Sequence, residues 1–440
     1  TYLDETIALQ EADRIDALEL GNEADLPLRG LPIVVKDNIH VAGMPNTAGT
    51  PALRNFIPKQ DSSAVAALRR AGAIILAKAN MHELAFGITS DNWAFGRVGN
   101  AYDSSVIAGG SSGGSAVAVA MGMAAAALGT DTGGSVRIPA ALNGLCGLRS
   151  TIGRYATDGV TPVAHTRDSV GTMARSMADL IRLDGVLSTK ASEVSTDISL
   201  SGLRLGVPRT YFFESLQSDV ASAVESLFIK LQEQGVTLVD VEIENLKQLN
   251  EETSFTVALY EVVEDLKSYL LEYDIGIELS ELVNEMATSH TCALLKGQLH
   301  NPISREQYEN AINHSRPLLQ QSYRDCFAEN NISALIFPTT PLTAKPLQKQ
   351  DDTVLFNGES LPSFPTYIRN TDPGSNAGLP GLTLPIGLDI DGLPIGIELD
   401  GLPNTDRALL AIGLEMEKVL TKLPLPAGTN CSLQSSHIIQ

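Results

Sequence analysis

The sequence predicts an α/β protein in which one large mixed, mostly parallel β-sheet is covered by helices on both faces. Three observations carry this prediction. The 440 residues, 43% of them hydrophobic, are enough for a large core. Short apolar runs alternate with helical patterns along most of the chain, and glycine-rich turns join them. Repetition of strand, loop and helix is typical of sheets with helices packed on both sides.

The alternation is clearest in the first third of the chain. Short buried strands are expected where apolar runs of four to eight residues end in polar or glycine-rich turns, and helices where the apolar spacing is three to four. Asp61 or Ser62 is expected to cap the first helix of this region. The predicted strands are 31–39, 73–80 and 124–132, and the predicted helices are 61–73, 113–123 and 134–145.

After residue 151 the pattern continues more loosely. Residues 245–331 read as mostly helical, with many acids and few strand signals. Because no internal repeat and no linker is found, we predict a single domain over 1–440 with this helical excursion. The further predicted strands are 203–209, 236–243, 334–341, 381–388 and 393–401, and the further predicted helices are 1–18, 176–187, 217–235 and 404–420.

Charge excludes several classes of partner. With 31 basic and 52 acidic residues the net charge is −21, which opposes binding to nucleic acid or to anionic lipid. The longest apolar candidate, 116–128, is too short to span a membrane. Acids scattered through residues 1–18 favour an amphipathic helix over a signal peptide. We therefore expect a cytoplasmic protein with a small-molecule ligand, and a homodimer is one alternative for its assembly.

The cysteines give no sign of a metal centre or a disulfide framework. Cys146, Cys292, Cys326 and Cys431 are far apart, with no CxxC pair and no histidine at a zinc spacing. We expect four reduced thiols, no metal and no cofactor.

The stretch from 107 to 137 holds two clusters of glycine and serine around one apolar segment. A flexible linker would not run straight into apolar elements on each side. A phosphate-binding Walker loop would need a lysine that neither cluster has. Gly109 to Gly113 matches the G-x-S-x-G elbow of α/β-hydrolase esterases, but that mechanism needs a late histidine base, and His437 lies in a terminal tail. The esterase stays open as an alternative.

A lysine offers another way to activate a serine. A serine hydroxyl is a poor nucleophile until a base takes its proton, and a lysine becomes such a base when burial keeps its amine neutral. Lys36 ends the apolar run that begins at Leu31, at the expected carboxyl edge of a parallel strand. Open α/β sheets build their sites at this edge. Lys36 is therefore the candidate base, and the alternative is a lysine that only marks where the strand meets solvent.

These residues resemble a known family. "GGSSGGSAVAVA", followed by "GTDTGGSVRIPAALNGLCGL" and preceded by "GLPIVVKDNI", is similar to the amidase signature family of serine hydrolases, whose core would span about 31–176. Ser111 and Ser135 are 24 residues apart (135 minus 111), as in the family pattern. The resemblance implies the amidase signature fold and a Ser-cisSer-Lys triad: Ser135 as nucleophile, Ser111 as bridging serine after a cis peptide bond from Gly110, and Lys36 as base.

The second cluster has a role of its own. We expect "TDTGGS" to curl so that its backbone amides converge where an oxyanion develops. Asp131 and Arg137 are expected to form an ion pair that holds this loop, and Ser112 supports the first cluster. The predicted donors are the amides of Thr132, Gly133, Gly134 and Ser135.

The substrate is less constrained than the chemistry. Residues 80–96 resemble the family's substrate-facing loop, in which Met81 and Phe86 would line an apolar acyl pocket or else belong to the core. Residues 151–176 look most similar to indoleacetamide and mandelamide hydrolases, which implies an aryl-substituted amide split into an acid and ammonia. Aryl acylamidases, allophanate-type hydrolases and an inactive scaffold stay open. The tRNA-dependent amidotransferase A subunit also stays open, although its arginine-rich segment is not evident around 286–298.

Overall fold

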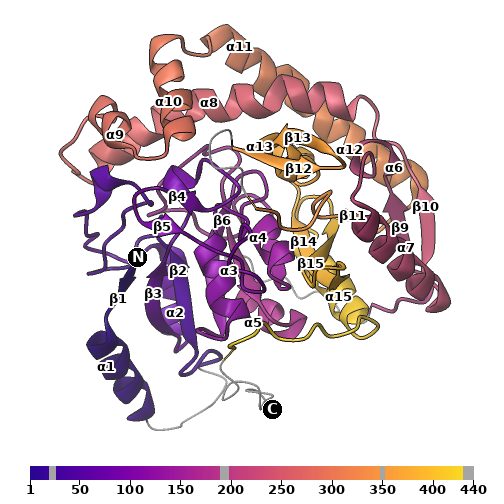
Figure 1. Ribbon diagram of the computed structural model, residues 1–440, viewed down its shortest axis with the longest axis horizontal. Coiled ribbons are helices and arrows are strands. Elements are labelled where there is room, and N and C mark those ends of the chain that lie inside the picture. The colour runs from indigo at the N-terminus through magenta and orange to yellow at the C-terminus, as the bar shows by residue number, and fades with distance from the viewer. Residues whose placement is uncertain (19–25, 189–197, 347–351, 430–440) are drawn as a thin grey trace.

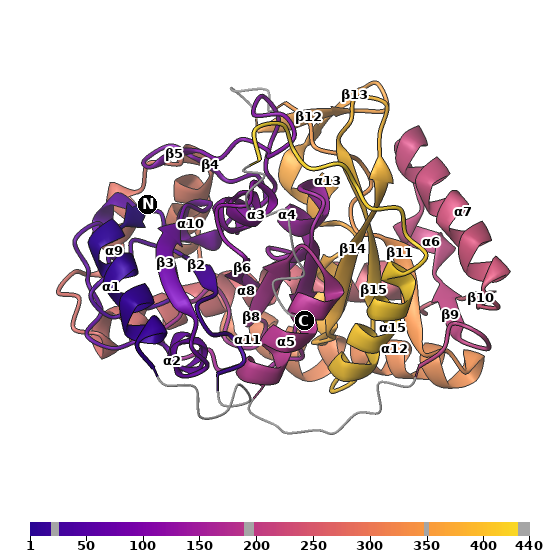
Figure 2. The ribbon, with the colours of Figure 1, turned by 90° about the horizontal axis from the view of Figure 1, so that it is seen from below.

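The computed structural model describes residues 1–18, 26–188, 198–346 and 352–429. Within these ranges an eleven-stranded sheet crosses the molecule in the order β1-β3-β2-β6-β8-β7-β14-β15-β11-β9-β10 (Figure 2). Its strands are β1 (Tyr2–Leu3), β2 (Pro32–Lys36), β3 (Ile74–Ala79), β6 (Ala126–Asp131), β7 (Cys146–Arg149), β8 (Ser169–Ala174), β9 (Arg204–Val207), β10 (Thr237–Asp240), β11 (Ala334–Pro338), β14 (Gly381–Leu388) and β15 (Pro394–Asp400). Two small hairpins pair β4 (Asp91–Asn92) with β5 (Gly96–Arg97) and β12 (Thr353–Phe356) with β13 (Glu359–Pro362).

The α-helices fall into three groups along the chain. The first is α1 (Glu5–Asp16), α2 (Ser63–Arg70), α3 (Gly113–Ala120), α4 (Arg137–Leu142), α5 (Met177–Leu187), α6 (Arg209–Phe212) and α7 (Ser218–Glu233). The second is α8 (Leu246–Glu272), α9 (Leu279–Glu285), α10 (Ser289–His300), α11 (Arg305–Asn310) and α12 (Arg316–Asn330). The third is α13 (Ser363–Ile368), α14 (Asp372–Ala377) and α15 (Asp406–Glu417).

The predicted α/β architecture with a large mixed sheet is confirmed, and antiparallel pairing takes a larger part than the alternating pattern indicates. Parallel pairs join β3, β2 and β6 near one end and β11, β9 and β10 at the other. From β6 through β8, β7, β14 and β15 to β11, each strand is antiparallel to the next. The edge pair of β1 with β3 is also antiparallel. A parallel pair needs a crossover connection, whereas β7 and β8, and β14 and β15, follow each other without a helix between them.

Helices cover both faces of the sheet. In β2 the side chains of Ile33 and Val35 join the larger core cluster, to which α2, α5, α7 and α15 contribute. Val34, which points the other way, packs in the cluster of α3 and α4. This alternation is the two-residue period of a strand that is buried on both faces.

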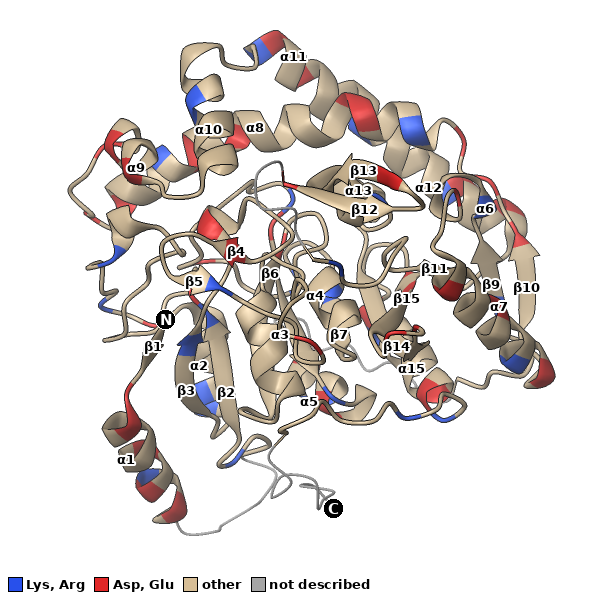
Figure 3. Cartoon of the chain, viewed as in Figure 1, with Lys and Arg blue, Asp and Glu red and all other residues tan. Residues whose placement is uncertain are grey.

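The second helix group follows the upper edge of the molecule, with α8 as its longest element (Figure 1). The predicted helical excursion is thus helical over 246–330 apart from its short connections. Figure 3 shows acidic and basic residues interspersed along the outer helices α1, α7, α8 and α11, which is the arrangement of a solvated face. None of the described helices has the length and apolar character needed to span a membrane.

Every strand and helix predicted from the sequence is present, and Ser62 is the cap of α2. The strands β7 and β8 were not predicted. Their residues, "CGLR" and "SVGTMA", mix glycine, serine and threonine with few large apolar side chains, so neither run resembles a buried strand. Of the cysteines, Cys146, Cys292 and Cys326 are free thiols, and Cys431 lies outside the described residues.

Candidate active site

Lys36 is the last residue of β2, and its side chain is completely buried. Its Nζ lies 2.6 Å from Ser111 Oγ, 2.7 Å from Thr130 Oγ1 and 3.4 Å from the Thr130 carbonyl oxygen. Burial lowers the pKa of Lys36 to about 7, although the negative charges of Asp131 and Asp168 act in the opposite direction. At neutral pH a large fraction of this amine is therefore uncharged.

The three neighbours of Lys36 suit both of its protonation states. A charged ammonium has one acceptor for each of its three hydrogens. A neutral amine donates its two hydrogens to Thr130 and turns its lone pair toward the Ser111 hydroxyl. The site can therefore take a proton from Ser111 and return it without rearrangement.

Ser111 lies in the turn before α3, and its peptide bond with Gly110 is cis. The neighbouring Ser112 amide donates to the Ser135 carbonyl oxygen at 3.2 Å, and the Ser112 hydroxyl donates to the Thr130 carbonyl oxygen at 3.2 Å. These bonds tie the two serine segments together. Ser135 retains 8% exposure, whereas Lys36 and Ser111 retain none.

The loop that carries Ser135 is organised by Asp131. Its carboxylate accepts from the backbone amides of Gly134 (2.8 Å) and Val136 (3.0 Å) and forms ion pairs with Arg137 (3.0 Å) and Arg149 (3.1 Å). Burial raises the pKa of Asp131, but the two guanidinium charges outweigh it and hold the pKa well below its usual range. The loop is therefore built around a permanently ionised carboxylate, and Arg137 lies where the sequence predicts it.

The bond from Gly134 to Asp131 removes one amide from the predicted set of oxyanion donors. An N–H that already donates to a carboxylate inside the loop is not free to donate a hydrogen bond to a developing oxyanion. The amides of Thr132, Gly133 and Ser135 have no hydrogen-bond partner within the described part of the chain. The Gly134 backbone has φ +142°, a conformation that glycine adopts readily, and its amide is directed at Asp131 Oδ1.

Thr132 is fixed by the connection between β7 and β8. Its hydroxyl donates to Asp168 Oδ1 at 2.5 Å, and the other oxygen of Asp168 accepts from the amides of Val163 and Ala164. Burial raises the pKa of Asp168 in spite of these hydrogen bonds. This connection thus braces the loop that carries Ser135 through Thr132.

Met81 and Phe86 lie on the loop after β3, which contacts the turn of Ser111 through the bond from the His82 amide to the Ser111 carbonyl oxygen. Met81 is fully buried, and Phe86 packs at the edge of a cluster formed largely by α8, α9 and α10. The buried Glu83 carboxylate accepts from the amides of Ala287 (3.1 Å) and Thr288 (2.6 Å) just before α10. The loop therefore joins the serine turn to the helical segment, and the acyl pocket of Met81 and Phe86 stays a prediction.

Sequence reasoning missed Thr130, Arg149 and Asp168. Thr130 directly precedes Asp131 in the "GTDTGGS" run, so its place near the site could have been inferred from the same strand end. Arg149 and Asp168 border β7 and β8, the two strands that the pattern did not reveal. Their contributions become visible only when the strands are paired.

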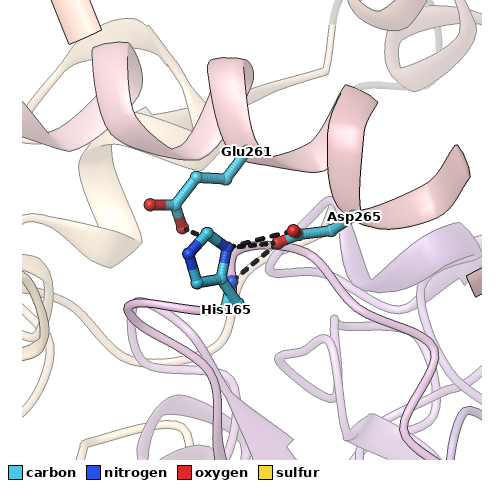
Figure 4. A group of neighbouring side chains, drawn as sticks. All are labelled: His165, Glu261 and Asp265. Atoms are coloured by element: carbon cyan, nitrogen blue, oxygen red, sulfur yellow. Dashed lines mark hydrogen bonds and ion pairs between the residues drawn. The ribbon is translucent and has the colours of Figure 1, made fainter. Parts of the chain in front are cut away.

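Among the described residues, His165, Glu261 and Asp265 form a group whose potential ligand atoms lie within 4.8 Å of one another (Figure 4). Protein donors already engage these oxygens. His165 Nδ1 lies 3.0 Å from both Asp265 oxygens, and Glu261 accepts from Thr166 and from Tyr308. The group fastens the connection between β7 and β8 to α8.

The amidase family model matches residues 2–410. The chain belongs to this amidase family. It is 44% identical over 414 residues to an indoleacetamide hydrolase of Agrobacterium vitis, covering 94% of this chain and 88% of that protein. It is 41% identical over 445 residues to a mandelamide hydrolase of Pseudomonas putida, covering 96% of this chain and 85% of that protein. The native peptide amidase of Stenotrophomonas maltophilia superposes with a TM-score of 0.81 at 28% identity, covering 98% of this chain and 90% of that one.

These likenesses confirm the predicted family and fold, and the protein is an amide-hydrolysing enzyme. Two alternatives lose their support. An α/β-hydrolase esterase would be expected to place a histidine against its serine, but Lys36 is the side chain bonded to Ser111 here, and His437 lies outside the described residues. An inactive scaffold would have no reason to keep a buried, partly neutral lysine against a serine hydroxyl.

Proposed function

We propose that this amidase hydrolyses a small, aryl-substituted carboxylic acid amide of the indoleacetamide or mandelamide type to the acid and ammonia. The observation that carries the chemical part is the buried Nζ of Lys36 at 2.6 Å from Ser111 Oγ. The substrate class rests on the indoleacetamide and mandelamide hydrolases to which the chain is similar over most of its length.

The reaction begins with two proton shifts. Neutral Lys36 takes the hydroxyl proton of Ser111, which takes the hydroxyl proton of Ser135, and Ser135 Oγ bonds to the amide carbonyl carbon. The carbonyl electrons move onto the oxygen, which in this proposal accepts hydrogen bonds from the amides of Thr132, Gly133 and Ser135. One such donor is worth about 3 to 4 kcal/mol of barrier in other hydrolases.

The tetrahedral intermediate then loses ammonia. The C–N bond breaks as the proton on Lys36 returns through Ser111 to the leaving nitrogen, which leaves an acyl ester on Ser135. A water molecule, deprotonated by the same relay, attacks the ester carbonyl carbon. The bond from this carbon to Ser135 Oγ then breaks as the relay returns the proton to Ser135 Oγ, and the carboxylic acid is released. Each turnover restores neutral Lys36, so the cycle needs neither a metal nor an organic cofactor.

The net charge bears on the location and the partners of the enzyme. We also propose a cytoplasmic enzyme that acts on an uncharged small molecule and binds neither nucleic acid nor membrane, which the net charge of −21 supports. A homodimer is one possible assembly, and light scattering after gel filtration measures it.

A fluorophosphonate probe tests the nucleophile. It is expected to label the wild-type protein at Ser135 and to leave Ser135→Ala unlabelled, because the probe forms a bond only with an activated serine. Labelling that persists in Ser135→Ala identifies a different nucleophile and rejects the mechanism.

Ammonia release tests the substrate. The panel is indole-3-acetamide, mandelamide, phenylacetamide, anilides, allophanate and glutamine, and the highest kcat/KM is expected for one of the first three. Highest activity on anilides or allophanate favours the aryl acylamidase or allophanate-type alternative. If glutamine is the one substrate of the panel that is hydrolysed, and if its hydrolysis requires a partner protein, the result favours the amidotransferase subunit.

A further inference from the structure

The turn that carries Ser111 is enclosed by the loop that follows β3. We propose that Ser90 on this loop is a positioning residue for Ser111, whose hydroxyl fixes the backbone from which the bridging serine projects. The inference rests on the proposed role of Ser111 as the relay between Lys36 and Ser135.

The Ser90 hydroxyl contacts the turn at two points. It donates to the Ser111 carbonyl oxygen at 3.4 Å and accepts from the Gly113 amide at 3.1 Å. Because Ser90 is completely buried, water does not compete for these groups. One hydroxyl thus spans the turn from the carbonyl of Ser111 to the first residue of α3.

Two glycines of the turn leave the space that the Ser90 side chain occupies. A Cβ atom on Gly110 would lie 2.8 Å from Ser90 Oγ, and one on Gly113 would lie 2.4 Å from the same oxygen. Both distances are shorter than real Cβ contacts. Two glycines of the "GGSSGG" run are therefore required by the position of the Ser90 side chain, so this serine and the turn form one packed unit.

The backbone of Ser90 shows that the hydroxyl matters at this position. Its φ of +57° lies in the left-handed region, which non-glycine residues rarely adopt and glycine adopts at little cost. The Ser90 carbonyl oxygen accepts from the Val98 amide at 3.1 Å, which helps to hold this conformation. A serine at a site whose backbone favours glycine indicates that the side chain has a task.

That task concerns proton transfer. Ser111 Oγ has to stay 2.6 Å from Lys36 Nζ while it receives a proton from Ser135, and small displacements slow such transfers steeply. The Ser111 carbonyl oxygen is held by Ser90 and by the His82 amide at 3.1 Å. Without the Ser90 hydroxyl the carbonyl keeps one donor, and the Gly113 amide loses its acceptor.

The experiment compares Ser90→Ala and Ser90→Gly with Ser115→Ala. Ser115 is an equally buried serine on α3 whose hydroxyl donates to the Leu128 carbonyl oxygen at 3.2 Å, away from Ser111. We measure kcat and KM for amide hydrolysis, the rate at which fluorophosphonate labels Ser135, and the melting temperature. Both Ser90 variants are expected to lower kcat and the labelling rate about tenfold, with KM within about twofold. Ser115→Ala is expected to lose stability but keep its kcat.

The glycine variant separates positioning from stability. Ser90→Gly removes the cost of the left-handed backbone, so it is expected to melt above Ser90→Ala and yet to be as slow. Wild-type kcat and labelling in Ser90→Gly overturn the inference, also where Ser90→Ala fails to fold. A loss that appears only in KM overturns it as well. Wild-type protein that is not labelled at Ser135 is a different outcome, since it rejects the proposed function itself.

Discussion

Two buried lysines lie side by side in this protein and have opposite surroundings. Lys36 ends β2, and Lys78 lies on β3 opposite Val35, one residue away in the parallel ladder. Neither side chain is exposed by more than 1%. Lys36 meets two hydroxyls and a carbonyl, whereas Lys78 Nζ lies 3.4 Å from the Asp37 carboxylate and donates to Asn46 Oδ1 and the Pro45 carbonyl oxygen.

The comparison shows what separates a base from a structural cation. Burial lowers the pKa of both lysines, to about 7 for Lys36 and to about 8 for Lys78, where the charge of Asp37 opposes the effect. Asp37 follows Lys36 in the chain, but its carboxylate contacts Lys78, because successive side chains of an extended segment point to opposite faces. Among the residues that the structure describes, no carboxylate is in ion-pair contact with Lys36, which leaves the lone pair of its amine available.

The largest expected effect is that of Lys36→Met. It is expected to lower kcat about 10⁴-fold, because no other group can take the proton from Ser111. The same change should stabilise the fold by roughly 2 to 4 kcal/mol at pH 7, since it removes a buried amine whose charge burial disfavours.

The size of this stability gain depends on pH. With the pKa of Lys36 lowered to about 7, the unfolded chain binds a proton that the folded one lacks between pH 7 and the ordinary lysine range. Wild-type stability therefore rises with pH in that window, and the advantage of Lys36→Met shrinks there. Thermal melts at pH 6.5 and 9.5 check the trend, and a variant less stable than wild type at pH 6.5 contradicts it.

Lys78→Met is expected to have the opposite effects: it lowers the stability of the fold and leaves kcat nearly unchanged. It leaves the Asp37 carboxylate buried without its cation, which costs about 3 to 5 kcal/mol of unfolding free energy. The kcat per folded molecule should stay within about threefold of wild type. Adding Asp37→Asn removes the uncompensated charge and is expected to recover part of the stability in urea melts. A large loss of kcat in the folded double variant would give Lys78 a part in catalysis.

The pH profile of kcat/KM sharpens the contrast. Only neutral Lys36 acts as a base, so kcat/KM is expected to fall about tenfold per pH unit below its pKa of about 7 and to level off above it. The acidic limb of this pH profile should be unchanged in the double variant that combines Lys78→Met with Asp37→Asn, because Lys78 takes no part in the proton relay. A profile that is flat between pH 5 and 7 would exclude Lys36 as the base.

Thr130→Val has the smallest expected effect, and it tests the hydroxyl acceptor that distinguishes the surroundings of Lys36. It removes the hydroxyl that accepts from Lys36 at 2.7 Å and keeps the shape of the side chain. Since an acceptor stabilises the charged amine, its loss should lower the pKa of Lys36 further and move the acidic limb to lower pH. The amine also loses part of its orientation, so kcat at pH 8 is expected to fall about tenfold or less. A limb that moves to higher pH contradicts this assignment of donor and acceptor.

The sequence predicts the strand and the lysine but not the choice between the two lysines. "IVVKDN" and "ILAKAN" are both apolar runs that end in lysine and asparagine. The strand-edge argument that makes Lys36 the candidate base applies equally to Lys78, and the family resemblance is what favours Lys36 over Lys78. The physical difference lies in which lysine Asp37 faces, and that depends on the pairing of β2 with β3, which a one-dimensional pattern does not contain.

Other features escape the sequence for similar reasons. The Gly134 amide looks like any other donor in "TDTGGS" until the turn is seen to direct it at Asp131. Arg149 gives no signal because its strand is short and rich in small residues. In contrast, Ser111 and Ser135 lie beside well-marked elements, since Ser111 precedes α3 and Ser135 lies between β6 and α4. The bond from the Ser112 amide to the Ser135 carbonyl oxygen shows that these two segments are in contact.

Glu83 sets a condition for exchanging parts with related enzymes. This carboxylate is buried at the junction of the serine turn and the helical segment, where it accepts hydrogen bonds from two backbone amides just before α10. A chimaera that imports helices from a relative with a different path at residues 287–288 would leave the buried Glu83 carboxylate without its two donors, at a cost of several kcal/mol. Glu83 directly follows His82, whose amide donates to the Ser111 carbonyl oxygen. The graft boundary therefore has to include residue 83, so that the acid and its two amides are inherited together.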